Sequence, residues 1–143
     1  MTAQSAKSHA IRLVVPFHDL DPLQVVWHGN YLKYFDRARF ALFDHCGIDL
    51  LAYSQRTNCF FPVTRTSTKH ILPLVYGDEI LVRARVREAH IRIVLDFEIQ
   101  RLRDGALTTR GKGEQVAVQH PQMEMLLQIP PEIEAALSAT ANP

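Results

Sequence analysis

The sequence predicts one α+β domain in which a long helix packs against an antiparallel sheet. The first observation is the spacing of apolar residues, which is about two before residue 18, about 3.6 from residue 30 to 46, and two again after residue 59. The second is that only a few residues separate the later alternating stretches, as in antiparallel hairpins. The third is size, because 143 residues with 47% hydrophobic content can form one core.

The predicted elements follow one another without a linker or an internal repeat. They are a strand at 10–17, a helix at 30–46, a connector or short helix at 48–57, strands at 59–71, 79–87, 91–100 and 106–119, and a short helix from about 130 to 137. Residues 1–9 are predicted to be a flexible tail, and residues 10–143 a single domain.

Apolar side chains predict which face of each element is buried. On the first strand they are Ile11, Leu13, Val15 and Phe17, and on the helix they are Tyr31, Tyr34, Phe35, Ala38, Ala41, Leu42 and His45. Of the later strands, 79–87 buries Ile80, Val82, Ala84 and Val86, and 91–100 buries Ile91, Ile93, Leu95, Phe97 and Ile99. Asn30 is a suitable N-cap for the helix and Gly47 a suitable residue to end it. Gly111 and Gly113 predict a bulge or a close backbone contact in the last strand.

Composition excludes several classes of protein. A net charge of +1 and a pI near 7.9 argue against a dedicated nucleic-acid binder. The polar N-terminus has no apolar signal segment, and no stretch has the roughly 18 apolar residues of a membrane helix, so a cytoplasmic protein is expected. Cys46 and Cys59 match no zinc or redox spacing and are expected to be reduced, buried thiols.

The loop at 18–29 is the stretch most suggestive of function. It places the carboxylate of Asp21 between a strand and the start of a helix, where unsatisfied N–H groups and the helix dipole can stabilise an oxyanion. The alternative is that Asp21 only forms a turn with Pro22. His18, Asp19, Asp21 and His28 match no metal-binding spacing, so no metal is expected.

Three motifs in this region resemble a known family. They are Asp19-x-Asp21, Val25-Val26-Trp27-His28-Gly29-Asn30-Tyr31 and Tyr34-Phe35-Asp36-x-Ala38-Arg39. Together they resemble the opening of hotdog-fold acyl-CoA thioesterases, in particular those similar to 4-hydroxybenzoyl-CoA thioesterase. The resemblance implies a five-stranded, curved antiparallel sheet wrapped around a long central helix. It also implies a homodimer or homotetramer that hydrolyses thioesters of coenzyme A or acyl carrier protein, with no cofactor beyond the carrier of the substrate.

The same resemblance implies roles for residues of the loop. Asp21 is the candidate nucleophile or general base, whereas Asp19 is a loop or supporting group. His28 is a candidate to polarise the thioester carbonyl, through its ring or through the backbone N–H groups beside it. The candidates for substrate binding are Gln24, Trp27, Gly29, Asn30 and Tyr31, although Asn30 and Tyr31 also suit a helix cap and a core aromatic. The family usually has a glycine-containing pair where this chain has Leu23-Gln24.

Basic residues near the turn at 88–91 are candidates to hold the phosphates of coenzyme A. They are Arg87, His90 and Arg92, since arginine matches phosphate geometry well. Arg83 and Arg85 are expected instead to pair with Asp96 and Glu98 across the hairpin. Two other functions stay open, namely a dehydratase or hydratase acting on acyl thioesters, and a non-catalytic module that binds them.

Overall fold

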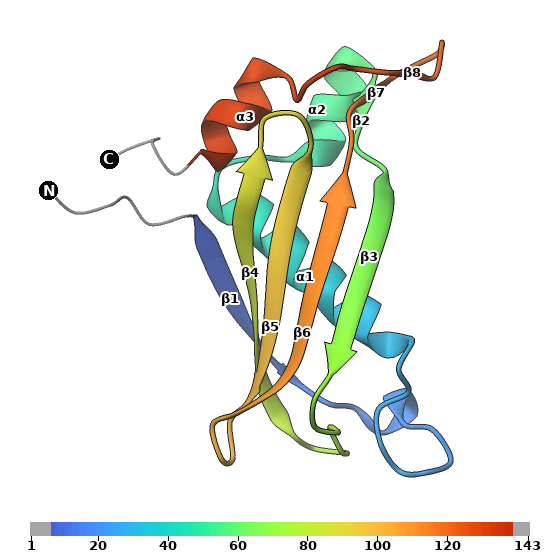
Figure 1. Ribbon diagram of the computed structural model, residues 1–143, viewed down its shortest axis with the longest axis vertical. Coiled ribbons are helices and arrows are strands. Elements are labelled where there is room, and N and C mark those ends of the chain that lie inside the picture. Colours follow the sequence, from blue (N-terminus) through green and yellow to red (C-terminus); the bar gives the residue numbers. More distant parts are fainter. Residues whose placement is uncertain (1–6, 139–143) are drawn as a thin grey trace, which may run out of the picture.

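A computed structural model describes residues 7–138, which form a five-stranded antiparallel sheet with α1 (Asn30–His45) across one face (Figure 1). The strands of this sheet are β1 (Ser8–Val14), β3 (Val63–His70), β4 (Glu79–Ala89), β5 (Ile93–Arg101) and β6 (Ala106–Gln115). Their order across the sheet is β1-β4-β5-β6-β3, and every neighbouring pair is antiparallel. The predicted α+β class and five-stranded antiparallel sheet are therefore confirmed, while the curvature of the sheet around the helix stays a prediction.

The remaining elements are short. They are the 3₁₀ turn η1 (Phe17–Asp19), α2 (Leu50–Thr57), α3 (Pro131–Leu137) and a second small sheet of β2 (Cys59–Phe60), β7 (Val118–Gln119) and β8 (Glu124–Met125). The predicted short helices at 48–57 and 130–137 are thus present. Within residues 7–138 no helix is long and apolar enough to cross a membrane.

The packing of α1 on the sheet depends on aromatic residues and one glycine. The ring of Phe35 stacks on Phe97 of β5, with centroids 4.7 Å apart. Gly111 of β6 lies under the same ring, so close that a Cβ atom at position 111 would be 2.5 Å from Phe35 Cε2. The predicted close contact at Gly111 is confirmed, and α1 ends as predicted with Gly47 at a positive φ of 80°.

The sequence predictions for the first strand need correction. Ser8 and His9, which fall in the predicted tail, pair with β4 as part of β1, whereas residues 1–6 lie outside the described residues. Leu13 and Val15 are buried, but Phe17 is 69% exposed because the chain turns into η1 after Pro16. Proline lacks the N–H that would continue the ladder of sheet hydrogen bonds.

Three later boundaries also differ from the prediction. The predicted strand at 59–71 divides into β2 and β3 around Pro62, and the predicted strand at 106–119 divides into β6 and β7. Ile91 is exposed in the turn before β5, although the other apolar residues predicted to face inward on β4 and β5 are buried. Since proline cannot donate to a ladder, Pro62 explains the first of these breaks.

The connection between β3 and β4 matters most for function. β3 pairs with β6 at one edge of the sheet, whereas β4 lies between β1 and β5. The chain between them, residues 71–78, must therefore cross the end of the sheet. The loop at 18–29 lies at this same end, opposite the β4–β5 turn and α3 (Figure 1). Two long loops thus meet beside the N-terminus of α1.

The Phe35–Gly111 contact gives a stability prediction. Gly111→Ala should lower the free energy of unfolding by about 1–3 kcal/mol, because the added methyl group overpacks the contact with Phe35. Gly113→Ala is the matched control on the same strand, since its added methyl group would meet Phe97 at an ordinary 3.4 Å. Urea unfolding of the three proteins measures the difference, and equal losses in both variants would contradict the proposed packing.

Candidate active site

The loop carrying Asp21 is a closed turn with its own hydrogen bonds. Asp21 N–H donates to the carbonyl of Val25 at 2.8 Å, and its side-chain Oδ1 accepts the N–H of Leu23 at 2.8 Å. Val26 N–H donates to the carbonyl of Leu74 at 2.9 Å, which joins this loop to residues 71–78. The turn role expected for Asp21 is therefore present, and Oδ2 of the carboxylate has no hydrogen-bond partner within residues 7–138.

Asp19 is the most enclosed carboxylate near this loop and is only 2% exposed. Its Oδ1 accepts from Lys33 Nζ and its Oδ2 from the Tyr34 hydroxyl, both at 2.6 Å. Its backbone carbonyl accepts from Asn30 Nδ2 at 2.8 Å and from Trp27 N–H at 3.0 Å. Asp19 therefore fixes the end of the loop against the first turn of α1.

These contacts determine the charge of Asp19. Burial acts to raise the pKa of this carboxyl, but the hydrogen bonds from Lys33 and Tyr34 and the charge of Lys33 outweigh burial and lower its pKa below the ordinary 3.8. Burial and the hydrogen bond to Asp19 raise the pKa of Tyr34 well above its ordinary value. Asp19 is thus an ionised supporting group, as the sequence suggested.

The start of α1 presents free backbone donors. Asn30 N–H and Tyr31 N–H donate back to the carbonyls of Trp27 and His28, whereas the N–H groups of His28 and Gly29 have no partner in the described part of the chain. Such donors at a helix N-terminus can stabilise a developing negative charge. Gly29, not Asn30, occupies the N-cap position, so the predicted cap is wrong.

Gly29 leaves room for the indole ring of Trp27. A Cβ atom on Gly29 would clash with the indole ring, which is 50% exposed and folds back over the helix start. Trp27 therefore shields one side of the turn, and neither Trp27 nor Gly29 lines the cavity that contains Asp21.

That cavity has a volume of about 320 Å³. It is lined by Asp21, Val25, Val26, His28, Tyr31, His70, Ile71, Leu72 and Pro73. Asp21, His28 and Tyr31 are thus brought together as the sequence suggested. The sequence analysis missed His70, whose ring stands edge-on to that of Tyr31 at 4.6 Å, because position 70 is distant in sequence and belongs to no motif.

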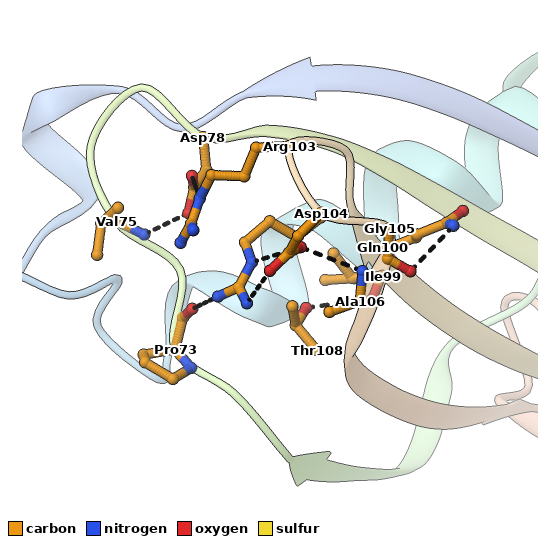
Figure 2. Close-up of polar contacts among 11 residues, drawn as sticks. Pro73, Val75, Asp78, Ile99, Gln100, Arg103, Asp104, Gly105, Ala106 and Thr108 are labelled. Atoms are coloured by element: carbon orange, nitrogen blue, oxygen red, sulfur yellow. Dashed lines mark hydrogen bonds and ion pairs between the residues drawn. The ribbon is translucent and has the colours of Figure 1, made fainter.

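The opposite wall of the cavity is held by an ionic network (Figure 2). Arg101, only 8% exposed, donates from Nη1 to the carbonyl of Pro73 at 3.1 Å and from Nη2 to Asp104 at 2.7 Å. Buried Asp78 accepts from Val75 N–H and from Arg103 Nε, both at 2.9 Å. The hydrogen bond from Arg101 lowers the pKa of Asp104 to about 2. The β5–β6 turn therefore positions residues 73–78.

Gln24 does not line the cavity, and its side chain is exposed. Its backbone has a positive φ of 68°, a conformation that costs a residue other than glycine about 1–2 kcal/mol. The structure thus gives a backbone reason for the glycine usual in the resembling family. We infer that Gln24 keeps the same turn at some cost in stability.

The basic residues predicted to hold phosphates lie away from the cavity within one chain. Arg87 pairs with Asp96 at 2.8 Å, His90 with Glu134 at 3.0 Å and Arg92 with Glu114 at 3.3 Å. The β4–β5 turn near which they lie is beside α3, at the other end of the sheet from the loop at 18–29 (Figure 1). In the β4–β5 register Arg83 lies opposite Glu98 and Arg85 opposite Asp96, as predicted, although neither arginine has a carboxylate within 4.0 Å among residues 7–138.

Comparison with known proteins identifies the family. The family model described as the thioesterase-like superfamily matches residues 15–137, which include nearly all of the described fold. The chain belongs to the thioesterase-like superfamily. A Synechocystis sp. (strain PCC 6803) protein named provisionally as the esterase sll0410 is 25% identical over 138 residues, covering 96% of this chain and 82% of the relative.

Solved thioesterase structures share the fold of this superfamily member. The 1,4-dihydroxy-2-naphthoyl-CoA thioesterase of Synechocystis superimposes with a TM-score of 0.84 at 20% identity, over 95% of this chain and 99% of the other. The 4-hydroxybenzoyl-CoA thioesterase of Pseudomonas sp. strain CBS-3 gives 0.81 at 19% identity, over 92% and 99% of the two chains. The resemblance to hotdog-fold acyl-CoA thioesterases is therefore confirmed at the level of family and fold.

The buried Asp19 carboxylate gives a prediction on stability and pH. Because its pKa is lowered in the folded protein, its stabilisation is fully present above its ordinary pKa of 3.8 and is lost as the pH falls through the lowered value. At pH 7 Asp19→Asn should lose about 1.5–3 kcal/mol, the scale of hydrogen bonds to a charged group. Urea unfolding from pH 7 to about pH 2 should show the gap between parent and variant shrinking below about pH 4.

The control for this experiment is Asp44→Asn, on the exposed side of α1. That substitution should change the free energy of unfolding by less than about 0.5 kcal/mol at any of these pH values. An Asp19→Asn gap that stays constant down to the lowest pH would contradict the charged network.

Proposed function

We propose that this protein hydrolyses an acyl thioester of coenzyme A or of an acyl carrier protein to the free acid and thiol. The observation that carries the proposal is that the Asp21 carboxylate lines the same cavity as His28, whose backbone N–H is unpaired among the described residues. Thioester hydrolysis needs both parts, an oxygen nucleophile and donors for the oxygen that becomes negative.

The two parts have separate supports. One carboxylate oxygen of Asp21 accepts Leu23 N–H and the other has no hydrogen-bond partner among residues 7–138, so the group is oriented but available. The backbone of His28 is held at the start of α1, where its carbonyl accepts Tyr31 N–H, so its own N–H needs no rearrangement when charge develops. This arrangement favours the backbone over the imidazole ring of His28 as the group that polarises the carbonyl.

Two routes fit these positions. As a nucleophile, Asp21 attacks the thioester carbonyl, the carbon–sulfur bond breaks, the thiolate leaves, and water then cleaves the mixed anhydride. As a general base, Asp21 takes a proton from water, which attacks the carbonyl directly. A single turnover in heavy-oxygen water that leaves label in the Asp21 carboxylate identifies the first route, with water attacking the Asp21 carbonyl of the anhydride.

The hydratase or dehydratase alternative has less support. That chemistry moves a proton at carbon and uses a histidine paired with a carboxylate. Asp21 forms no hydrogen bond with His28 or His70 in the described part of the chain, although all three line the cavity. The thiol-release assay proposed below also tests the alternative of a non-catalytic binding module.

Positive charge on the sheet face is the basis for proposing which carrier holds the acyl group. Arg83, Arg85 and Arg110 form no ion pair among residues 7–138, and they line one depression on the sheet face. Such cations suit either the phosphates of coenzyme A or an acidic carrier protein. The structural neighbours named for their coenzyme A thioester substrates support the first carrier.

The assembly is proposed to be a homodimer or homotetramer, paired first along β3. No residue of this edge strand is buried, and an uncovered edge invites pairing with another chain. Light scattering at micromolar concentration should give at least a dimer. Val63→Lys on β3 should shift the mass toward the monomer, because the charge sits in the paired edge.

Val14→Lys is the matched control for this assembly, since Val14 is a similarly exposed valine on β1 at the other edge. It should leave the mass unchanged. A parent protein that is monomeric at micromolar concentration would rule out the proposed dimer.

The decisive test of function is Asp21→Asn. Asparagine retains the oxygen that accepts Leu23 N–H, so the turn should persist, but the charge and basicity are lost. Turnover of acyl-CoA substrates, measured by release of thiol, should fall about 10²-fold or more, while the free energy of unfolding should change by less than about 1 kcal/mol.

Asp44→Asn again serves as the carboxylate control and should hydrolyse thioesters at the parent rate. Parent and Asp21→Asn proteins that hydrolyse equally fast would place the reaction elsewhere. A parent protein that binds acyl-CoA without releasing thiol would favour the binding module.

A further inference from the structure

His70 lies at the end of β3 and lines the Asp21 cavity. Its backbone is fixed by the sheet, because it pairs with Thr109 of β6. The chain just beyond it is also held, since Ile71 N–H donates to the carbonyl of Thr108 at 2.8 Å. The side chain of His70 therefore extends into the cavity wall from a rigid strand end.

The imidazole ring of His70 is free to exchange protons. It stands edge-on to the ring of Tyr31, with centroids 4.6 Å apart, but the residue is exposed. Within residues 7–138 its side chain forms no hydrogen bond or ion pair, with Asp21 or with any other residue. Histidine is the side chain that most readily accepts and releases a proton near neutral pH. His70 thus supplies a proton acceptor that is separate from Asp21.

The nucleophile route leaves a task that Asp21 cannot perform. Once one oxygen of its carboxylate is bonded to the acyl group, Asp21 is part of an uncharged anhydride and is no longer a base. Water must still add to this anhydride, and it reacts faster when a base removes its proton. The route therefore needs a second proton acceptor in the same cavity.

Besides Asp21, three of the residues that line the cavity can exchange a proton, namely His28, Tyr31 and His70. Tyr31 is only 3% exposed, and burial raises the pKa of its hydroxyl above the ordinary 10, so it stays protonated. His28 belongs to the same loop as Asp21, and its backbone N–H is the proposed donor to the substrate oxygen. His70 comes from β3, so a water beside it can approach the anhydride from a different wall of the cavity.

We propose that His70 is the general base for the second half of the reaction, in which water removes the acyl group from Asp21. The imidazole takes a proton from water as the water oxygen bonds to a carbonyl carbon of the anhydride. The bond from that carbon to the leaving carboxylate then breaks. One product forms as a carboxylic acid, which ionises, and His70 returns its proton to solvent. This inference rests on the proposed hydrolysis and on its nucleophile route.

The first test separates the two halves of the reaction. His70→Gln is mixed rapidly with octanoyl-CoA or benzoyl-CoA, whichever the parent hydrolyses faster, and the release of thiol is followed. A burst of about one thiol per chain at nearly the parent rate should precede a steady rate about 10²-fold below the parent, the scale of a lost general base. Because His70 is exposed, the substitution should leave the fold intact. Equal slowing of the burst and the steady phase would indicate a structural role and overturn the proposal.

Two other histidines serve as comparisons. His45 is exposed, lies at the far end of α1 and stacks on His9, so His45→Gln should retain the parent rate in both phases. His28→Gln tests the other imidazole that lines the cavity. A burst followed by a slow phase in His28→Gln but not in His70→Gln would assign the base to His28 and overturn the proposal.

The second test uses hydroxylamine, a nucleophile strong enough to cleave an anhydride without a base. Its nitrogen bonds to the acyl carbon, the Asp21 carboxylate leaves, and a hydroxamic acid is released. Added hydroxylamine should therefore return the steady rate of thiol release by His70→Gln toward the parent rate. The double variant with Asp21→Asn corrects for direct attack on the thioester. A slow phase that hydroxylamine leaves unchanged would overturn the proposal.

The parent protein separates this inference from the proposed function. A parent that releases thiol, together with a His70→Gln variant that turns over at the same rate, would retain the hydrolysis and reject His70 as its base. A parent that releases no thiol would reject the hydrolysis, and with it the role of His70.

Discussion

The buried carboxylate of Asp19 is the interaction on which the candidate site depends. It joins the start of the loop at 18–29 to the first turn of α1 through the side chains of Lys33, Tyr34 and Asn30 and the backbone N–H of Trp27. An ionised carboxylate that is only 2% exposed would be costly without such donors. Because these bonds use both the side chain and the carbonyl of one residue, they position the Asp21 turn and the backbone N–H groups just before α1 together.

A second ionic network positions the opposite wall of the Asp21 cavity. Arg101, Asp104, Arg103 and Asp78 tie the β5–β6 turn to residues 73–78, which cross the end of the sheet (Figure 2). Asp21 itself belongs to neither network. One of its carboxylate oxygens accepts the N–H of Leu23 within its own turn. The division is physically sensible, because a carboxylate engaged by a cation is a weak base, whereas one supported by a single backbone N–H keeps its reactivity.

Sequence patterns predicted the parts of this architecture that arise from local periodicity. The 3.6-residue spacing located α1 nearly to the residue, and the alternation of Ile80 to Val86 located β4. They did not predict that β3 pairs with β6, since strand order depends on long-range contacts. The motif around Asp21 predicted one side of the cavity, but tertiary structure alone brings His70 into it and Arg101 against the carbonyl of Pro73 in its wall. Arg39 was part of a family motif, yet its burial follows from the sheet that covers it.

The exposed edge strand β3 borders two cavities. His70 lines the Asp21 cavity, Thr66 and Val63 line a second cavity between α1 and the sheet, and all three are exposed in the single chain. Whatever covers β3 will therefore enclose both cavities at once, remove water from them and strengthen the hydrogen bonds made inside. If a second copy pairs along this edge, the oligomer supplies the missing wall for both. Assembly would then govern the polarisation of the carbonyl at the start of α1, so that turnover should fall when the chains separate.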